Sequence, residues 1–219
     1  MKVIVTGATG MVGEGVLLEC LQDPRITRVL AVTRKPTGRQ HPKLQEARLA
    51  DFEHPGSIEA ELTGYDACYF CLGVSAAGMK EAEYTRLTYD LTLGFARTLA
   101  RLNPQMTFCY VSGAGTDSTE KGSQMWARVK GRTENELRRL PFRATYMFRL
   151  GLMTVTPGQQ HVSSLNRYMG WLFPGLRRIA PSWVSTMAEV GRAMINVTHH
   201  GYEKPVLEVK DIVELAHRH

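Results

Sequence analysis

Cysteine is scarce in this chain of 219 residues, and its placement argues against two kinds of site. The four cysteines are Cys20, Cys68, Cys71 and Cys109. Cys68 and Cys71 have C-x-x-C spacing, but they lie in a predicted strand, residues 66–72, where residues three apart point to opposite faces. A redox pair is expected at the start of a helix, and no second pair of ligands stands at zinc spacing. We therefore predict buried thiols and no metal site.

Long apolar runs are absent too. No stretch is long enough to span a bilayer, and the N-terminus lacks the charged region and long apolar run of a secretory signal. We expect a cytoplasmic protein without a transmembrane segment.

Positive charge exceeds negative charge, with a formal net charge of +6. The basic residues are spread out in short pairs with acidic residues between them, and no long basic run stands out. We expect an anionic cofactor or substrate and no nucleic-acid partner.

Glycines at regular spacing open the chain. Residues 2–6 are predicted to be a strand, Gly7, Gly10 and Gly13 follow, and a helical pattern covers residues 11–22. Gly7 allows a tight turn, Gly10 lets a pyrophosphate approach the backbone, and Gly13 lets the helix pack against the strand. The N–H groups at the helix start then face the phosphates. The predicted phosphate-binding segment is completed by Thr9, Met11 and Val12. The structural alternative is a tight strand-to-helix turn that binds nothing.

Strand and helix patterns alternate along the first two thirds of the chain. Strands are predicted near residues 2–6, 28–33, 46–50, 66–72, 106–112 and 143–149. Helices are predicted at 11–22, 80–102 and 122–139. This order predicts an α/β fold with a Rossmann-type doubly wound parallel sheet, which binds ligands at the carboxyl ends of its strands.

The rhythm changes after residue 150. We predict a single NAD(P)-binding domain, residues 1–219, in which 155–205 form a small lid or substrate-side appendage. Within it, residues 183–198 are predicted to be helical, followed by a strand at 205–209 and a helix at 211–217. The apolar, then basic, stretch 168–178 is interpreted as a lid over an apolar pocket. The alternative is an interfacial helix in peripheral contact with a membrane or a partner.

The ends of the next strands suggest how a dinucleotide is held. An NAD-selective fold usually places an acid after its second strand, but Arg34 and Lys35 stand here, which favours NADP(H) over NAD(H). The alternative is a pair of solvated loop charges. Asp51 is predicted to accept from the adenine amino group and Phe52 to lie against the ring. Further contacts, to the riboses, are predicted at Leu72 and Gly73.

Several segments together resemble one superfamily. They are the glycine turn, residues 70–73 (Phe-Cys-Leu-Gly), residues 111–115 (Val-Ser-Gly-Ala-Gly), and residues 129–131 (Val-Lys-Gly) followed by Glu134. They resemble the short-chain dehydrogenase/reductases, and among these the atypical members that are NAD-dependent epimerase/dehydratase-like. They also resemble the Tat-interacting-protein-like group. The resemblance covers about residues 1–155.

The resemblance implies a catalytic arrangement of Ser, Tyr and Lys, for which the matching positions are Ser112, Trp126 and Lys130. In the superfamily the tyrosine exchanges a proton, the lysine holds the nicotinamide ribose, and the serine orients the substrate oxygen. Residues 126 and 130 lie one helical turn apart on one face. The family also shows Arg-Pro-Gly beside the nicotinamide, which corresponds to Arg149 and Gly151 with a leucine between them.

Trp126 departs from this pattern. An indole N–H donates a hydrogen bond but does not exchange a proton near neutral pH, which general acid–base catalysis requires. Gly113 also stands where many members carry a second serine. Thr116 and Ser118, on the following loop, are the candidates to replace that serine. Tyr84, Tyr89 and Tyr110 are the alternative proton donors, although each is more often a core or rim tyrosine.

Two functions therefore remain open. The first is an NADP(H)-dependent oxidoreductase that acts on a small, fairly apolar carbonyl/alcohol substrate with an atypical proton donor. The second is a non-catalytic NADP(H)-binding sensor or scaffold, which the loss of the tyrosine suggests directly.

Overall fold

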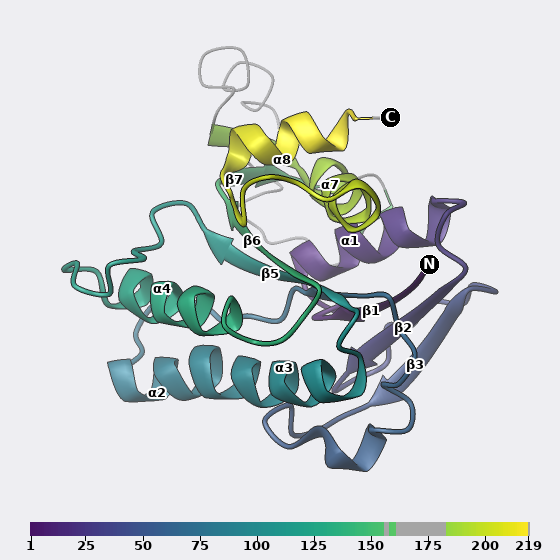
Figure 1. Ribbon diagram of the computed structural model, residues 1–219, viewed down its shortest axis with the longest axis horizontal. Helices are drawn as coiled ribbons and strands as arrows, with labels where there is room; N and C mark the ends of the chain where they lie inside the picture. Colours follow the sequence, from purple (N-terminus) through teal and green to yellow (C-terminus); the bar gives the residue numbers. More distant parts are fainter. Residues whose placement is uncertain (156–157, 161–182, 219) are drawn as a thin grey trace.

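The computed structural model describes residues 1–155, 158–160 and 183–218 (Figure 1). In this part of the chain seven parallel strands form one sheet in the order β3-β2-β1-β4-β5-β6-β9. Their bounds are β1 Lys2–Thr6, β2 Arg28–Thr33, β3 Leu44–Arg48, β4 Ala67–Phe70, β5 Thr107–Gly113, β6 Ala144–Leu150 and β9 Val206–Leu207. The order reverses between β1 and β4, which is where a doubly wound fold binds its ligand.

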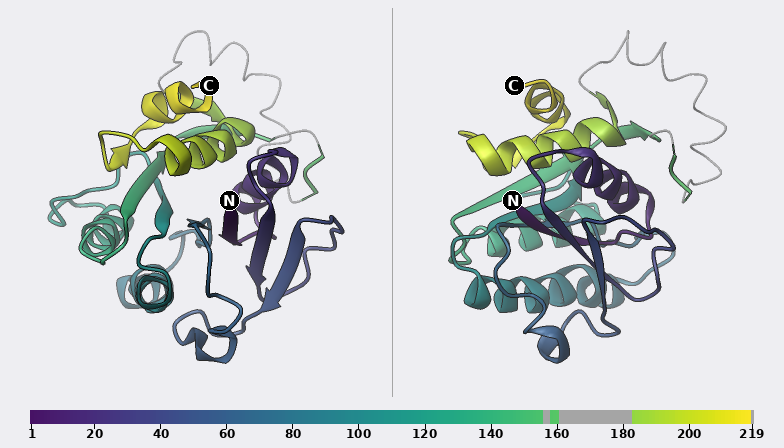
Figure 2. Two further views of the ribbon diagram at one scale, coloured as in Figure 1. Left: turned by 45° about the vertical axis from the view of Figure 1, so that its right-hand side comes forward. Right: turned by 90° about the vertical axis from the view of Figure 1, so that its right-hand side faces the viewer.

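Helices cover both faces of the sheet. On one face lie α1 (Met11–Gln22), α7 (Met187–His200) and α8 (Val209–Ala216), and α1 packs along α7 (Figure 2). On the other lie α3 (Leu91–Leu102) and α4 (Met125–Leu137). The helix that ends as α3 begins as α2 (Glu81–Thr85) and continues through the π-type turn η2 (Arg86–Asp90); the short 3-10 helix η1 spans Pro55–Ile58. The predicted Rossmann-type α/β fold is confirmed.

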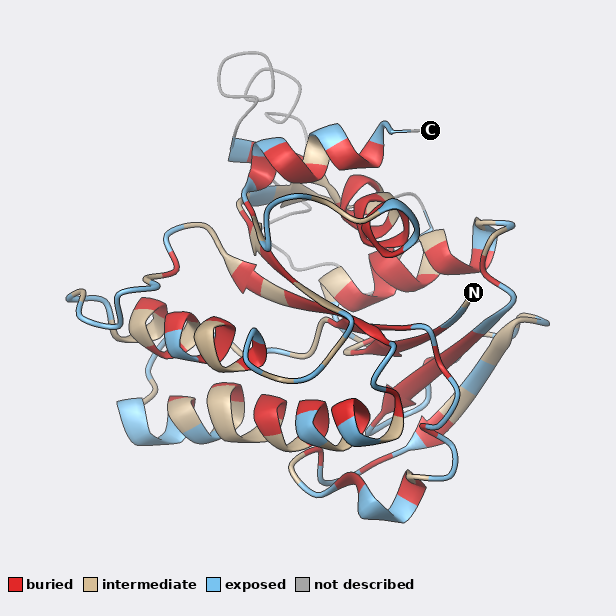
Figure 3. Ribbon diagram, viewed as in Figure 1, coloured by how far each residue is buried: buried red, intermediate tan, exposed pale blue. Residues whose placement is uncertain are grey.

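The burial pattern explains why these segments adopt these structures. Strands β1, β2, β4 and β5 are almost wholly buried (Figure 3). Their apolar sequences fit this position, because helices cover both faces of the sheet. Cys68 packs into the core on the α3 face, whereas Cys71 packs against the α1 face, so the two thiols point apart as predicted. Burial raises the pKa of both thiols.

Predictions for the C-terminal third were less accurate. The structure has a second pair of strands, β7 (Leu152–Thr154) and β8 (Val184–Thr186), and β8 occupies residues where we predicted the start of a helix. Val184 and Thr186 are β-branched and pair with β7, and the Thr186 hydroxyl then caps α7 by accepting from Glu189 N–H. Stretch 168–178, predicted to be a lid or interfacial helix, lies outside the described residues, and the single-domain prediction remains untested.

Candidate functional site

The turn between β1 and α1 has the close contacts that its glycines were predicted to allow. Gly7 has a φ of 68°, and a Cβ there would lie 2.7 Å from the Cys71 carbonyl oxygen. A Cβ on Gly13 would lie 2.2 Å from the Gly7 carbonyl oxygen. Gly10 N–H donates to that same oxygen at 2.8 Å, and no side chain caps the N-terminus of α1. The N-cap residue of α1 is thus a glycine, which has no side chain to cap the helix, and this is typical of a phosphate site at a helix start.

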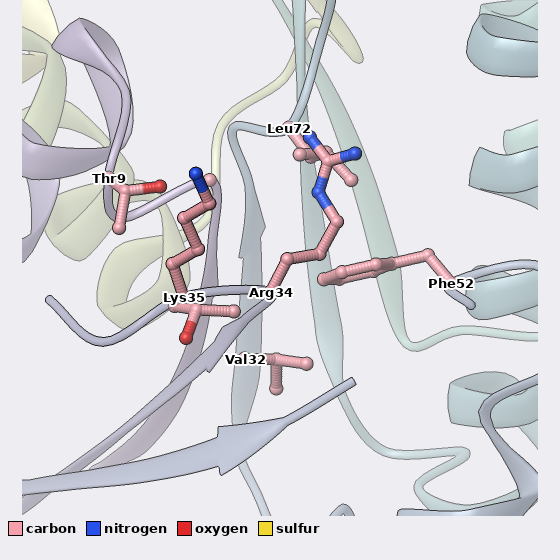
Figure 4. Close-up of a pocket in the computed structure, with 8 residues that line it drawn as sticks. Thr9, Val32, Arg34, Lys35, Phe52 and Leu72 are labelled. Atoms are coloured by element: carbon pink, nitrogen blue, oxygen red, sulfur yellow. The ribbon is translucent and has the colours of Figure 1, made fainter. Parts of the chain in front are cut away.

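A cavity of about 440 Å³ lies at the carboxyl ends of β1, β2 and β4, beside this turn (Figure 4). Its walls are formed by Gly7, Thr9, Val32, Thr33, Arg34, Lys35, Phe52 and Leu72. Six of these residues were predicted from the sequence to bind a cofactor. Gly10, Met11, Val12 and Gly13 complete the adjoining turn. The structure thus brings the phosphate and adenosine elements of the prediction together at one edge of the sheet.

Thr33 and Val32 line the cavity but were not among the predicted binding residues. Thr33 is 3% exposed, and its Oγ1 has no hydrogen-bond partner in the described part of the chain. A buried hydroxyl without a partner costs about 1–3 kcal/mol, so a ligand atom that bonds to it is favoured. The sequence feature that could have identified Thr33 as a binding residue is its position at the end of β2, directly before Arg34. This orphaned hydroxyl fits a nucleotide ribose or phosphate.

Among the described residues, two cations and no acid face this cavity. Arg34 and Lys35 are exposed and extend from the end of β2, with Arg34 near Phe52 and Leu72 in the close-up (Figure 4). Neither side chain forms an ion pair with a described residue, and none of the lining residues is acidic. The arrangement is suited to an anionic group such as a phosphate.

Asp51 and Gly73 lie outside the lining of this cavity. Asp51 is exposed, and its carboxylate accepts from Glu53 N–H and lies 2.9 Å from His54 Nδ1. These contacts lower the pKa of Asp51, with the hydrogen bond from His54 as the largest cause. Phe52 turns inward against Phe95, with ring centroids 5.5 Å apart. Gly73 is exposed with open space around it, and neither residue's predicted contact with a cofactor is tested by these positions.

At the end of β5, a buried carboxylate joins two predicted site residues. Ser112 Oγ donates to Glu134 Oε1 at 2.6 Å, and Arg149 donates to both oxygens of the same carboxylate, at 3.2 and 2.6 Å. Glu134 is 1% exposed. Arg149 also donates to Glu208 at 3.2 Å and to Ser118 Oγ at 2.6 Å. Our predicted site residues omitted Glu134, although it stands in the motif that carried the resemblance.

Lys130 and Trp126 lie on α4 beside this cluster. Lys130 Nζ donates to the Val111 carbonyl oxygen at 3.5 Å and lies 5.4 Å from the centre of the Tyr110 ring. Burial lowers the pKa of Lys130 to about 8, against the opposing charge of Glu134. The Trp126 ring packs over the loop after β5, 3.6 Å from where a Cβ on Gly113 or Gly115 would lie.

The groups considered above as substitutes for the serine or as proton donors either have other partners or are buried. Thr116 Oγ1 donates to the Gly113 carbonyl at 2.7 Å. Tyr84 and Tyr110 are almost fully buried, which raises the pKa of each. Tyr89 packs against Arg132. Gly151 lies against the backbone of Trp183, because a Cβ there would be 2.4 Å from the Trp183 carbonyl oxygen.

Comparison with known proteins gives the family. The model of the NAD dependent epimerase/dehydratase family matches residues 3–123, more than half of the chain. The chain belongs to this family. The match spans the glycine turn, the cavity and the end of β5, and the resemblance inferred from the sequence is confirmed. Membership in a family described as NAD dependent supports a nicotinamide dinucleotide as the cofactor.

Solved structures agree on the fold. Glucuronic acid dehydrogenase from Chromohalobacter salexigens has a TM-score of 0.69 at 12% identity, covering 94% of this chain and 75% of that one. WbmF from Bordetella bronchiseptica, solved in complex with NAD+, has a TM-score of 0.64 at 14% identity, covering 98% and 76%.

Curated relatives correct the predicted location. The chain is 28% identical to protein fmp52, mitochondrial, of Emericella nidulans, over 89% of this chain and 86% of that protein. It is 25% identical to protein FMP52-1, mitochondrial, of Scheffersomyces stipitis, over 99% and 97%. These names contradict our cytoplasmic prediction, which was wrong because lacking a secretory signal does not distinguish one aqueous compartment from another. Among the described helices, none is long and apolar enough to cross a membrane.

Proposed function

We propose that this protein binds NADP(H) in the cavity beside the glycine turn and acts as an oxidoreductase on a small, fairly apolar carbonyl/alcohol substrate. The observation that carries the proposal is the end of β2. There the orphaned hydroxyl of Thr33 lies beside Arg34 and Lys35, in a cavity whose described lining residues include no acid. An acid would favour the ribose hydroxyls of NAD(H), whereas two cations favour a 2′-phosphate.

Residues along the edge of the sheet have distinct roles in this proposal. The backbone of Gly7–Gly13 holds the pyrophosphate, and Phe52 and Leu72 flank the adenosine. Lys130 holds the nicotinamide ribose, and the Gly151 backbone contacts the carboxamide. When bound, the reduced cofactor would supply a hydride to the carbonyl carbon, and water would supply the proton to the carbonyl oxygen. Ser112 donates its hydroxyl proton to Glu134, so its oxygen can still accept a hydrogen bond from the substrate but has no second proton to donate.

A non-catalytic NADP(H)-binding sensor or scaffold is the second candidate, and a specific observation favours it. By the resemblance, Trp126 corresponds to the proton donor, and its ring lies against Gly113 and Gly115. The cofactor cavity does not include Trp126, so binding survives where proton transfer is lost.

Equilibrium binding of NADPH and NADH to the purified protein tests the shared part of both candidates. Arg34→Ala should weaken NADPH binding by at least about tenfold, the worth of one charge-assisted hydrogen bond, and leave NADH binding nearly unchanged. Lys210→Ala is the matched control, because Lys210 is exposed on α8 and outside the cavity. Equal losses for both cofactors would remove the case for NADP(H).

Turnover separates the two candidates. Consumption of NADPH in a screen of carbonyl compounds and quinones supports the oxidoreductase. Tight NADPH binding without consumption supports the sensor.

A further inference from the structure

A second cavity, of about 250 Å³, opens at the same edge of the sheet but shares no lining residue with the first. It lies between the loop after β5, which supplies Ala114 and Gly115, and the start of α8, which supplies Glu208 and Val209. Trp183, directly before β8, completes it. The Trp126 ring of α4 packs against the glycine loop after β5. The cavity therefore adjoins the predicted catalytic residues.

The walls of the second cavity suit an apolar ring. Trp183 is 62% exposed. Among the described residues, Leu152 is the one other large apolar residue that is exposed. An exposed aromatic side chain at the rim of a cavity is typical of a ligand-binding surface. The backbone of Trp183 lies close to the end of β6, since a Cβ on Gly151 would be 2.4 Å from the Trp183 carbonyl oxygen. On the opposite wall, Gly115 has no side chain, and the Trp126 ring lies 3.6 Å from where its Cβ would be, so an aromatic ring lies behind this wall as well.

Among the described lining residues, the one charged group is a carboxylate. The Glu208 side chain is 52% exposed and lies 3.2 Å from Arg149 NH1. Arg149 is itself 12% exposed, is not part of the lining, and is shared with the buried Glu134. One guanidinium therefore serves two carboxylates, and the charge presented to the cavity is negative.

We propose that this cavity binds the ring of the substrate, that the substrate is a neutral, ring-containing compound with a hydroxyl group, and that Glu208 excludes anionic substrates. Glu208 accepts a hydrogen bond from the hydroxyl group, and Trp183 packs against the ring. This inference rests on the proposed oxidoreductase and names the substrate class of that same site. It separates this chain from uronate dehydrogenase of Agrobacterium tumefaciens, which has the same fold and, as its name states, acts on a uronate.

Two probes with one ring system test the inference at neutral pH: 2-naphthol, a neutral hydroxyl compound, and 2-naphthoate, an anion. Calorimetric titration uses the full chain, with and without saturating NADPH. We expect 2-naphthol to bind at least about tenfold more tightly, because a carboxylate within several ångström of Glu208 is repelled by more than 1 kcal/mol at partly buried positions. Glu208→Gln should narrow this preference to within about threefold.

Trp183→Ala should weaken binding of both probes by about tenfold, since it removes the aromatic wall. Leu152→Ala is the matched control: Leu152 is also apolar and exposed but does not line the cavity, so its loss should leave both affinities unchanged. Thermal unfolding of each variant checks that it folds.

The inference is overturned if 2-naphthol does not bind, if 2-naphthoate binds equally well, or if Trp183→Ala behaves like Leu152→Ala. A failure of the proposed function looks different. In that case NADPH does not bind, while 2-naphthol still binds in a manner that depends on Trp183 and Glu208. If NADPH binds but the probes show no preference, only the substrate class is lost.

Discussion

Lys130 keeps an amine at a place where burial opposes its charge. Its pKa falls from 10.5 to about 8, and desolvation is the largest cause. At pH 7 both the folded and the unfolded chain carry the charge, so the folded state bears the full desolvation cost. Between about pH 8 and 10.5 the unfolded chain holds a proton that the folded protein has released, so the free energy of unfolding rises with pH.

Replacement of Lys130 by methionine should therefore stabilise the protein at neutral pH. One pKa unit corresponds to about 1.4 kcal/mol, so we expect a gain of up to about 3 kcal/mol at pH 7 that shrinks towards pH 10. Urea unfolding of wild type and Lys130→Met at both pH values measures it. Lys210→Met, at an exposed site, should show no such pH-dependent difference. If Lys130→Met stabilises the protein and also weakens cofactor binding, Lys130 is present for ligand binding and not for stability.

Among helices and strands, the junction of β1 and α1 leaves little room for an added side chain. A Cβ on Gly13 would meet the Gly7 carbonyl oxygen at 2.2 Å, and this atom belongs to backbone that cannot rotate away. Gly13→Ala must push α1 from the turn, which should cost about 2 kcal/mol or more and abolish cofactor binding. Differential scanning calorimetry and an NADPH titration measure the two effects.

Gly56→Ala is the matched control for Gly13→Ala. Gly56 lies in η1, and a Cβ there would have no heavy atom within 4 Å. Its substitution should change stability by no more than about 0.5 kcal/mol. If both variants behaved alike, the close packing of α1 on the turn would not be what the glycine spacing provides.

Elements defined by strong local patterns were predictable, and side-chain partners were not. The apolar run of β2 and the glycine turn before α1 placed both elements at their observed bounds, because burial on two faces and the special backbone of glycine act locally. The same reasoning brought Arg34, Lys35 and Phe52 to one cavity, since parallel strands end at one edge. It could not show that Ser112 donates to Glu134, because that bond joins a strand and a helix 22 residues apart.

Across the whole molecule, Glu134 and Arg149 tie the two helical layers to the sheet. Glu134 lies on α4, on one face, and Arg149 on β6 reaches from it to Glu208 at the start of α8, on the other face. Both members of the central pair are largely buried, at 1% and 12% side-chain exposure. A buried pair adds little net stability when complete, but removing one partner leaves an uncompensated charge.

Glu134→Gln keeps the shape of the side chain and removes its charge, so Arg149 retains only the half-exposed Glu208 as an anionic partner among the described residues. We expect a loss of about 3 kcal/mol in the free energy of unfolding, measured by urea denaturation. Glu136→Gln, two residues along α4, removes an exposed pair with Arg139 and should cost less than about 0.5 kcal/mol. Equal losses in the two variants would mean that the layers are held by apolar packing alone. A large loss for Glu134→Gln together with weaker NADPH binding would show that one ion-pair chain supports both the fold and the edge of the sheet where the cofactor is proposed to bind.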